Sequence, residues 1–138
     1  MADPEKYDEA TRKERRKQGR ELVDQLHGQL GRQVLDALDD VAPDFADFVF
    51  EFAFGDVYSR PGLSLKERQL VTISNLAALG NAQPQLKVHL RASLNVGWTK
   101  EELAEVLIQT AVYAGFPAGL NGLMALKEVL AEVDAEGE

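Results

Sequence analysis

The chain has 138 residues, of which 45% are apolar, and its 23 acidic and 15 basic residues give a formal net charge of −8. This length suits one domain with a buried core and is too short for two. The acidic balance argues against nucleic acid as a partner, because nonspecific binding requires many Lys and Arg side chains to neutralise phosphates. A basic cluster at residues 12–20 is interrupted by Glu14 and contains no aromatic residue, which predicts a solvated helix face.

The absence of cysteine excludes disulfides, thiolate metal sites and cysteine nucleophiles. The two histidines, His27 and His89, are not part of an HExxH motif or of a His/Asp cluster, so we expect no metal site. No apolar run approaches the roughly 18 residues of a membrane-spanning helix, and the first 20 residues lack the apolar core of a secretory signal. We therefore expect a cytoplasmic protein with no membrane contact.

Helical signals dominate the first 60 residues. An N-terminal segment, residues 1–30, predicts a mostly exposed helix over about residues 7–26 that ends at His27-Gly28. A short helix is expected over residues 32–40, and Pro43 suits the first helical position of the next one. That helix carries an apolar stripe at spacings of three and four, which is typical of a core or a subunit interface. The stripe consists of Phe45, Phe48, Val49 and Phe52.

Turn and capping signals divide the second half of the chain. Pro61-Gly62 predicts a turn, after which Ser64 and Glu67 form a capping box for a helix whose body, residues 70–79, is apolar around most of its circumference. This helix is predicted to be central and buried. Pro84 opens the next helix, which is expected to end near residue 96, before Gly97.

The last part of the chain predicts two more helices. Thr99 and Glu102 form a second capping box, and the helix they open is broken at residues 115–117. The final helix leads into an acidic tail, residues 132–138, which we expect to be frayed. No segment alternates apolar and polar residues with the period of a strand. The prediction is an all-α, single-domain bundle of about six or seven helices over residues 1–138.

His89 is the most informative position for chemistry. At about 100° per residue, Leu86, Ala92, Ser93 and Val96 lie within about 60° of it, so its side chain should face the core. A histidine on such a face is either a hydrogen-bonded core residue or a catalyst, and spacing alone leaves both open.

Other polar residues have ordinary structural explanations as well. Glu67 is accounted for by its capping box, and Arg68 by a solvated or ion-paired side chain. Tyr113 shares a helix face with Gln109, but a tyrosine at a core edge is common.

Three blocks of sequence favour a functional role for these residues. These are GDVYSRPGL at residues 55–63, HLRASLNVG at residues 89–97 and EVLIQTAVYAGFPA at residues 105–118. Their order and spacing resemble the carboxymuconolactone decarboxylase family of the alkylhydroperoxidase D-like superfamily, over residues 54–130. The resemblance implies an all-helical subunit assembled into a homo-oligomer, a trimer or hexamer, with sites near subunit boundaries. It also implies a small lactone acid as substrate, in the β-ketoadipate route of aromatic-acid breakdown.

The reaction that the resemblance implies needs no cofactor, because the substrate itself takes up the electron pair left by the departing carboxylate. The protein must stabilise the forming oxyanion and donate a proton, for which His89 is the candidate. Arg91 or Arg68 would hold the substrate carboxylates, with Tyr113 and Glu67 as further substrate-binding candidates. Arg91 points about 160° away from His89 on their shared helix, so it would serve a neighbouring subunit's site or a shared cleft.

Two other hypotheses stay open. In one, the same scaffold serves as an isomerase or decarboxylase of a different small acid. In the other, it is a non-catalytic binding or assembly protein in which His89 is only a core residue. The thiol peroxidases of the same superfamily act through a CxxC pair followed by a histidine. That activity is excluded here because the chain has no thiol.

Overall fold

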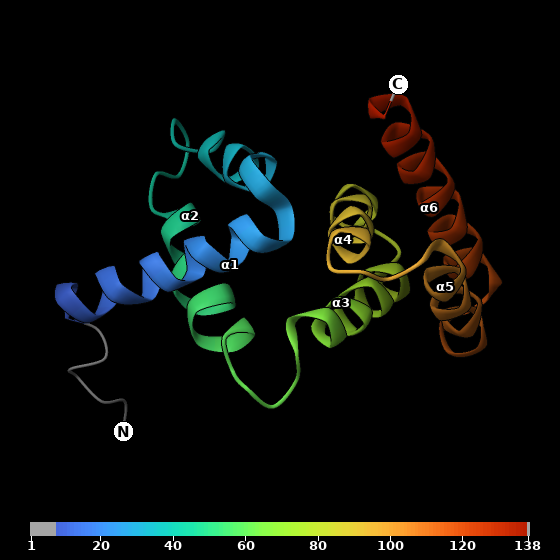
Figure 1. Ribbon diagram of the computed structural model, residues 1–138, viewed down its shortest axis with the longest axis horizontal. Coiled ribbons are helices and arrows are strands. Elements are labelled where there is room, and N and C mark those ends of the chain that lie inside the picture. The colour runs from blue at the N-terminus through green and yellow to red at the C-terminus, as the bar shows by residue number, and fades with distance from the viewer. Residues whose placement is uncertain (1–7, 138) are drawn as a thin grey trace. The chain divides into compact units, whose positions relative to one another are not determined.

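The structure is a computed structural model that describes residues 8–137 (Figure 1), and all regular secondary structure in this range is helical. The all-α prediction is confirmed. The chain divides into two compact units, Met1–Leu63 and Ser64–Glu138, which are described separately below. The expectation of a single domain over the whole chain stays a prediction. Within the described residues, no helix combines the length and the apolar content needed to cross a membrane.

Helix α1 (Glu9–Asp36) is interrupted at Gly28, whose backbone lies at φ 61° and ψ −153°. At its start, a side-chain oxygen of Asp8 accepts a hydrogen bond from the Thr11 N–H at 2.9 Å, which satisfies one of the unpaired donors of the first turn. The break confirms the predicted helix end at Gly28, since this dihedral region favours glycine. The helix that follows it ends at Asp36 rather than near residue 40.

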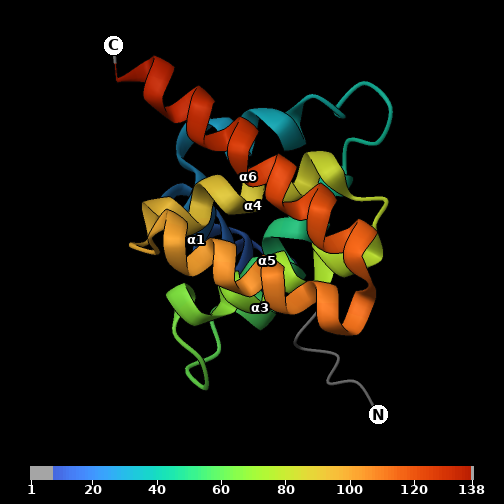
Figure 2. The ribbon, with the colours of Figure 1, turned by 90° about the vertical axis from the view of Figure 1, so that its right-hand side faces the viewer.

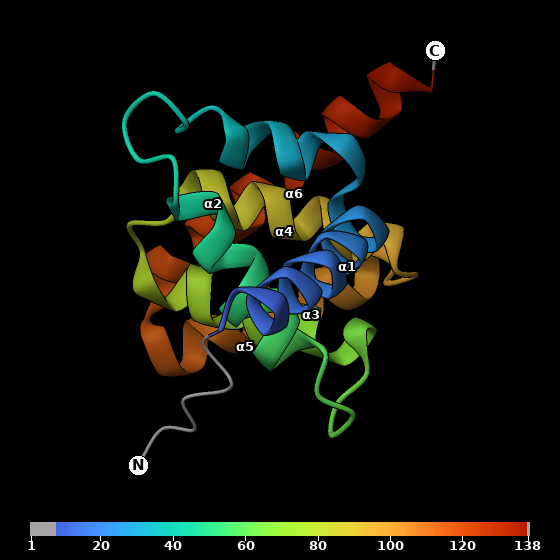
Figure 3. The ribbon, with the colours of Figure 1, turned by 90° about the vertical axis from the view of Figure 1, so that its left-hand side faces the viewer.

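Unit 1 is completed by α2 (Phe45–Phe48) and the π-helix η2 (Val49–Tyr58), across which α1 runs in Figure 3. Within η2 the hydrogen bonds span five residues instead of four. Pro43 lies in a turn two residues before α2 begins, so its predicted place as the first helical residue is wrong. The Phe45 N–H instead closes that turn on the carbonyl oxygen of Ala42, at 3.0 Å.

Ion pairs join one face of η2 to α1. The Glu51 carboxylate is almost fully buried and accepts hydrogen bonds from Arg12 at 3.3 Å and Arg16 at 3.1 Å. Arg15 makes a two-pronged contact with Asp56, at 2.8 and 2.6 Å. The prediction of a solvated basic face is therefore wrong for these three arginines.

The aromatic residues of α2 and η2 differ in burial according to whether they lie on the face that packs on α1. Phe50 and Phe54 are buried, whereas Phe45, Phe48 and Phe52 are exposed in the chain. The predicted stripe is thus not the core of unit 1. Periodicity identified one apolar stripe, whereas the face that packs on α1 carries Glu51 and Asp56, whose partners are distant in sequence.

Unit 2 contains the four remaining helices, which are labelled in Figure 2. They are α3 (Leu65–Leu79), α4 (Gln83–Asn95), α5 (Lys100–Ala114) and α6 (Phe116–Glu136). Both predicted capping boxes are present, at the starts of α3 and α5. Pro84 lies in the first turn of α4, and Gly97 follows that helix with φ 101°, as predicted.

The core of unit 2 lies along one face of α3. Gln69, Ile73 and Ala77 on this face are buried, and α3 packs against each of the other three helices. Val71 and Leu79 on its other side are exposed, so the prediction of a helix buried around most of its circumference is wrong. The larger core residues are Ile73, Leu86, Leu90, Leu103, Leu107, Leu126 and Val129.

At Gly19, α1 and η2 approach each other closely, because a methyl group at this position would overlap the carbonyl oxygen of Phe50. Gly19→Ala should therefore force the two helices apart and lower the free energy of unfolding by about 1–3 kcal/mol, the usual cost of overpacking. Gly62→Ala is the matched control, since nothing lies within 4 Å of its added methyl. Denaturant unfolding of the two variants measures the difference, and equal stabilities would contradict the close approach.

Candidate active site

His89 lies on α4 with its ring half-buried against α3. Its Nδ1 atom is 3.1 Å from the Oε1 atom of Gln69. Leu86 and Leu90, on either side of it, are almost completely buried, and the Ser93 hydroxyl donates to the His89 carbonyl oxygen at 2.7 Å. The prediction that this histidine faces the interior is confirmed, and α3 supplies its partner.

Gln69 is a functional candidate that the sequence analysis did not identify. Its side chain is completely buried, and its Nε2 atom has no hydrogen-bond partner among the described residues. Such unpaired buried donors are rare in folded proteins. A signal was available, because Gln69 stands four residues before Ile73 and eight before Ala77, on the buried stripe of α3.

Arg91 projects away from His89, as predicted, and forms an ion pair with Glu136 near the end of α6. One turn earlier on α4, Lys87 pairs with Glu128 at 3.2 Å and with Glu132 at 2.8 Å. The hydrogen bond with Glu136 raises the pKa of the Arg91 guanidinium, and the same contact lowers the pKa of the Glu136 carboxyl. We call these five residues the α4–α6 clamp.

The clamp explains why α6 is longer than expected. The acidic tail was predicted to fray from residue 132, but the helix continues to Glu136. Acidic residues four apart, Glu128, Glu132 and Glu136, lie on one side of α6 and meet the two cations of α4. Residue 138 of the predicted tail lies outside the described residues.

Glu67 closes the capping box of α3 by accepting a hydrogen bond from the Ser64 N–H at 2.7 Å. The hydrogen bonds with Ser64 lower the pKa of this carboxyl. Arg68 directly precedes Gln69 and is half-buried. By helical geometry, Arg68 shares a side of α3 with Asn75, two turns further on.

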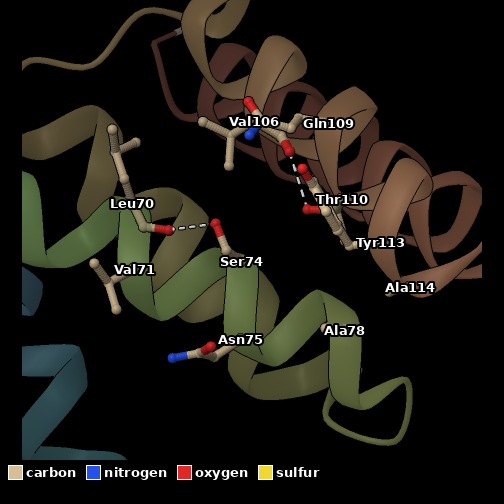
Figure 4. Close-up of a pocket in the computed structure, with 10 residues that line it drawn as sticks. All are labelled: Leu70, Val71, Ser74, Asn75, Ala78, Val106, Gln109, Thr110, Tyr113 and Ala114. Atoms are coloured by element: carbon tan, nitrogen blue, oxygen red, sulfur yellow. Dashed lines mark hydrogen bonds between the residues drawn. The ribbon is translucent and has the colours of Figure 1, made fainter.

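Tyr113 lies at the α3–α5 groove, an open depression of about 490 Å³ between these two helices (Figure 4). Tyr113 and Gln109 both line it, as their spacing predicted, and none of the lining residues is charged. The lining residues are Leu70, Val71, Ser74, Asn75, Ala78, Val106, Gln109, Thr110, Tyr113 and Ala114. The groove uses the side of α3 opposite Gln69, so one chain does not bring Tyr113 and His89 together.

His27, the other histidine, belongs to unit 1. Its ring meets that of Phe54 edge-on, with centroids 6.2 Å apart, and burial lowers its pKa to about 4. His27 is therefore neutral at physiological pH and is poorly suited to donate a proton there. Among the described residues, no three His, Asp or Glu side chains are grouped so that they could bind a metal ion.

In this all-α protein, the half-buried His89 is held against the buried amide of Gln69, which makes it a candidate general acid. Comparison of the sequence with family models matches residues 43–128 to the carboxymuconolactone decarboxylase family. The match covers more than half of the chain, from α2 to most of α6. The protein belongs to the carboxymuconolactone decarboxylase family.

Curated relatives agree with this assignment. The chain is 40% identical to a 4-carboxymuconolactone decarboxylase of Acinetobacter baylyi, over 87% of this chain and 90% of the relative. It is 33% identical to an uncharacterized 15.0 kDa protein of Paracoccus denitrificans, over 86% and 89% of the two chains. It is also 30% identical to a nitrosuccinic acid decarboxylase of Metarhizium robertsii, over 67% of this chain and 64% of the relative.

The α4–α6 clamp should hold the last turns of α6 in place. We expect Arg91→Ala and Glu136→Gln to speed amide hydrogen exchange in residues 132–136 by roughly two- to fivefold, the range for losing an exposed ion pair. Lys127→Ala, a change of an exposed cation on the same helix, should leave these amides unaffected. Exchange followed by mass spectrometry tests this, and equal protection in all three variants would show that the clamp does not order the helix end.

Proposed function

We propose that this protein is a cofactor-free decarboxylase of a small lactone acid of the 4-carboxymuconolactone type, acting in aromatic-acid breakdown. The main support is its 40% identity, over nearly the whole of both chains, to a relative named for that reaction. The orientation of His89 adds a chemical reason, because a half-buried imidazole held by a neighbouring amide is suited to deliver a proton to one defined place. The cytoplasmic location stays a prediction.

In this reaction the bond between the γ-carbon and its carboxylate breaks, and CO₂ leaves. The electron pair of that bond delocalises through the ring C=C bond to the lactone carbonyl oxygen, which becomes an oxyanion while the ring stays closed. A proton then adds to carbon and restores a neutral lactone ring. Because the substrate is its own electron sink, the protein needs only hydrogen-bond donors for the oxyanion and an acid for the carbon.

We propose that His89 is this acid. An imidazole has an unperturbed pKa of about 6.5, so it can give up a proton and recover one from water at neutral pH. Its Nδ1 atom is engaged with Gln69, so the proton would pass from Nε2. His27 offers no alternative, since burial keeps its pKa at about 4.

Arg68 is the first candidate to hold a substrate carboxylate, because it is half-buried and adjacent to Gln69. Arg91 is engaged with Glu136, so its proposed contact with substrate requires that ion pair to open or to face another subunit. Tyr113 would contribute a hydroxyl from the groove, and Glu67 would act beside its capping role. These four substrate-binding assignments are proposals.

A second candidate function is decarboxylation of a different small acid. The similarity to a nitrosuccinic acid decarboxylase favours it, since that relative is named for a substrate that differs from a carboxylated lactone. Turnover of γ-carboxymuconolactone measured beside a panel of related lactones and small dicarboxylic acids separates the two. Tight binding of these acids without turnover of any would instead favour a non-catalytic binding protein.

His89→Ala tests the proposed acid. We expect kcat to fall by about a hundredfold to ten-thousandfold, the usual range for loss of a general acid or base. His27→Gln is the matched control, because it removes the other histidine and should leave kcat within about twofold. Melting temperature and assembly state must be compared for both variants. A folded His89→Ala protein with near-normal turnover would reduce this residue to part of the core.

We also propose that the protein is a homo-oligomer, a trimer or hexamer. Large apolar side chains are exposed at the junction of α5 and α6, where Val112 is 75%, Tyr113 87% and Phe116 83% exposed. Ile108, Leu120 and Met124 extend this apolar surface along the same two helices. Apolar surfaces of this kind mark contact sites in small proteins.

Phe116→Glu should weaken such an assembly, because it places a charge in a contact surface that would otherwise exclude water. Sedimentation velocity at micromolar concentration should show an oligomer for the unaltered protein and a shift toward monomer for the variant. Lys127→Glu, another exposed change on α6, controls for the added negative charge. A stable monomer of the unaltered protein would contradict the proposed assembly and any site shared between subunits.

A further inference from the structure

Gln69 is a polar residue at a buried position, where an apolar residue would be expected to stabilise the fold better. Its side chain is completely buried, and its Nε2 atom has no hydrogen-bond partner among the described residues. An unpaired buried donor is destabilising, and an apolar residue of similar length, such as methionine, would avoid that loss. The Oε1 atom of Gln69 lies 3.1 Å from Nδ1 of His89.

We propose that Gln69 is a positioning residue that sets the tautomer and the ring orientation of His89. The amide presents its Oε1 atom to Nδ1. An amide oxygen only accepts hydrogen bonds, so Nδ1 must carry a hydrogen and Nε2 becomes the nitrogen that exchanges a proton with substrate. This assignment rests on the proposed function, in which His89 is the acid.

The contact suits both protonation states of the acid. The imidazolium carries hydrogens on both nitrogens, and its Nδ1–H can donate to Oε1. After the Nε2 proton has passed to substrate carbon, the neutral ring keeps the Nδ1–H and the same hydrogen bond, so no group needs to move. The reversed amide would donate from its nitrogen to Nδ1 and could not serve the imidazolium, which has no free lone pair.

A neutral amide also differs from a carboxylate in this place. A buried carboxylate would hold the imidazolium strongly and oppose loss of its proton. The Gln69 amide orients the ring without that opposition. Gln69 therefore determines which ring nitrogen of His89 carries the proton, and other groups bind the substrate.

The test combines ring nitrogen NMR with kinetics on the full chain. ¹⁵N shifts followed through a pH titration report which ring nitrogen carries the hydrogen once the imidazole is neutral. With only two histidines in the chain, His27→Gln suffices to assign the signals. The variants are Gln69→Met, which removes the acceptor, Gln69→Glu, which keeps one, and Ser93→Ala, a control equally buried beside His89.

We expect the unaltered protein to hold His89 mainly as the Nδ1–H tautomer. Gln69→Met should lower the ratio of this tautomer to the Nε2–H form by roughly fivefold to tenfold, as for one lost hydrogen bond. It should lower kcat by about ten- to a hundredfold with KM within about twofold, and leave the melting temperature no lower. Gln69→Glu should keep the hydrogen on Nδ1 but lower kcat, because its carboxylate opposes loss of the imidazolium proton. Ser93→Ala should change neither the tautomer nor kcat.

Three results would overturn the proposal. One is an Nε2–H tautomer in the unaltered protein; another is a Gln69→Met variant that keeps both tautomer and kcat. The third is a loss of kcat in Gln69→Met that is matched by a lower melting temperature and by the same loss in Ser93→Ala. If Gln69→Met does not fold, Gln69→Asn, with its amide one methylene shorter, tests the same contact. The tautomer is measured without substrate, so absence of turnover would overturn the proposed function alone.

Discussion

Close packing along one narrow face of α3 is the constraint from which the rest of unit 2 follows. Ile73 and Ala77 on this face bring α3 against α4, α5 and α6, and Gln69 stands one turn earlier on the same face. A polar residue at the end of an apolar stripe is carried into the interior by its neighbours. There it must find a partner inside the protein, and the side chain that it meets is His89.

Ion pairs set the second level of organisation, and in both units they join helices that are distant in sequence. In unit 1 the carboxylates of Glu51 and Asp56 bind arginines of α1. In unit 2, α4 and α6 are joined through Lys87 and Arg91. A chain with an excess of acidic residues thus uses several of its cations to join helices.

The two chemically interesting regions of unit 2 lie on different sides of α3. His89 is held on the Gln69 side, whereas the groove with Tyr113 is on the other. A decarboxylation that uses the substrate as electron sink requires few protein groups, so a single well-oriented acid and a nearby cation satisfy its chemistry. In such a site, the precision with which one imidazole is held matters more than the number of residues around the substrate.

The sequence by itself determined the local features of the fold. Helix starts at Ser64 and Thr99, helix breaks at Gly28 and Gly97, and the inward direction of His89 were all predicted correctly. Each depends on hydrogen bonds or dihedral preferences within about four residues, so a short window of sequence contains all the partners. The three family blocks added the reaction class, because they preserve order and spacing over most of the chain.

Only the tertiary structure decided which faces pack and which polar groups meet. The face of η2 buried against α1, the helical order of α6 up to Glu136 and the pairing of His89 with Gln69 all join residues more than a dozen positions apart. Periodicity shows that a helix has an apolar face, but it does not show which distant charge or amide will lie opposite. Those partners are set by how the helices cross, and the sequence pattern of a single helix does not encode that crossing.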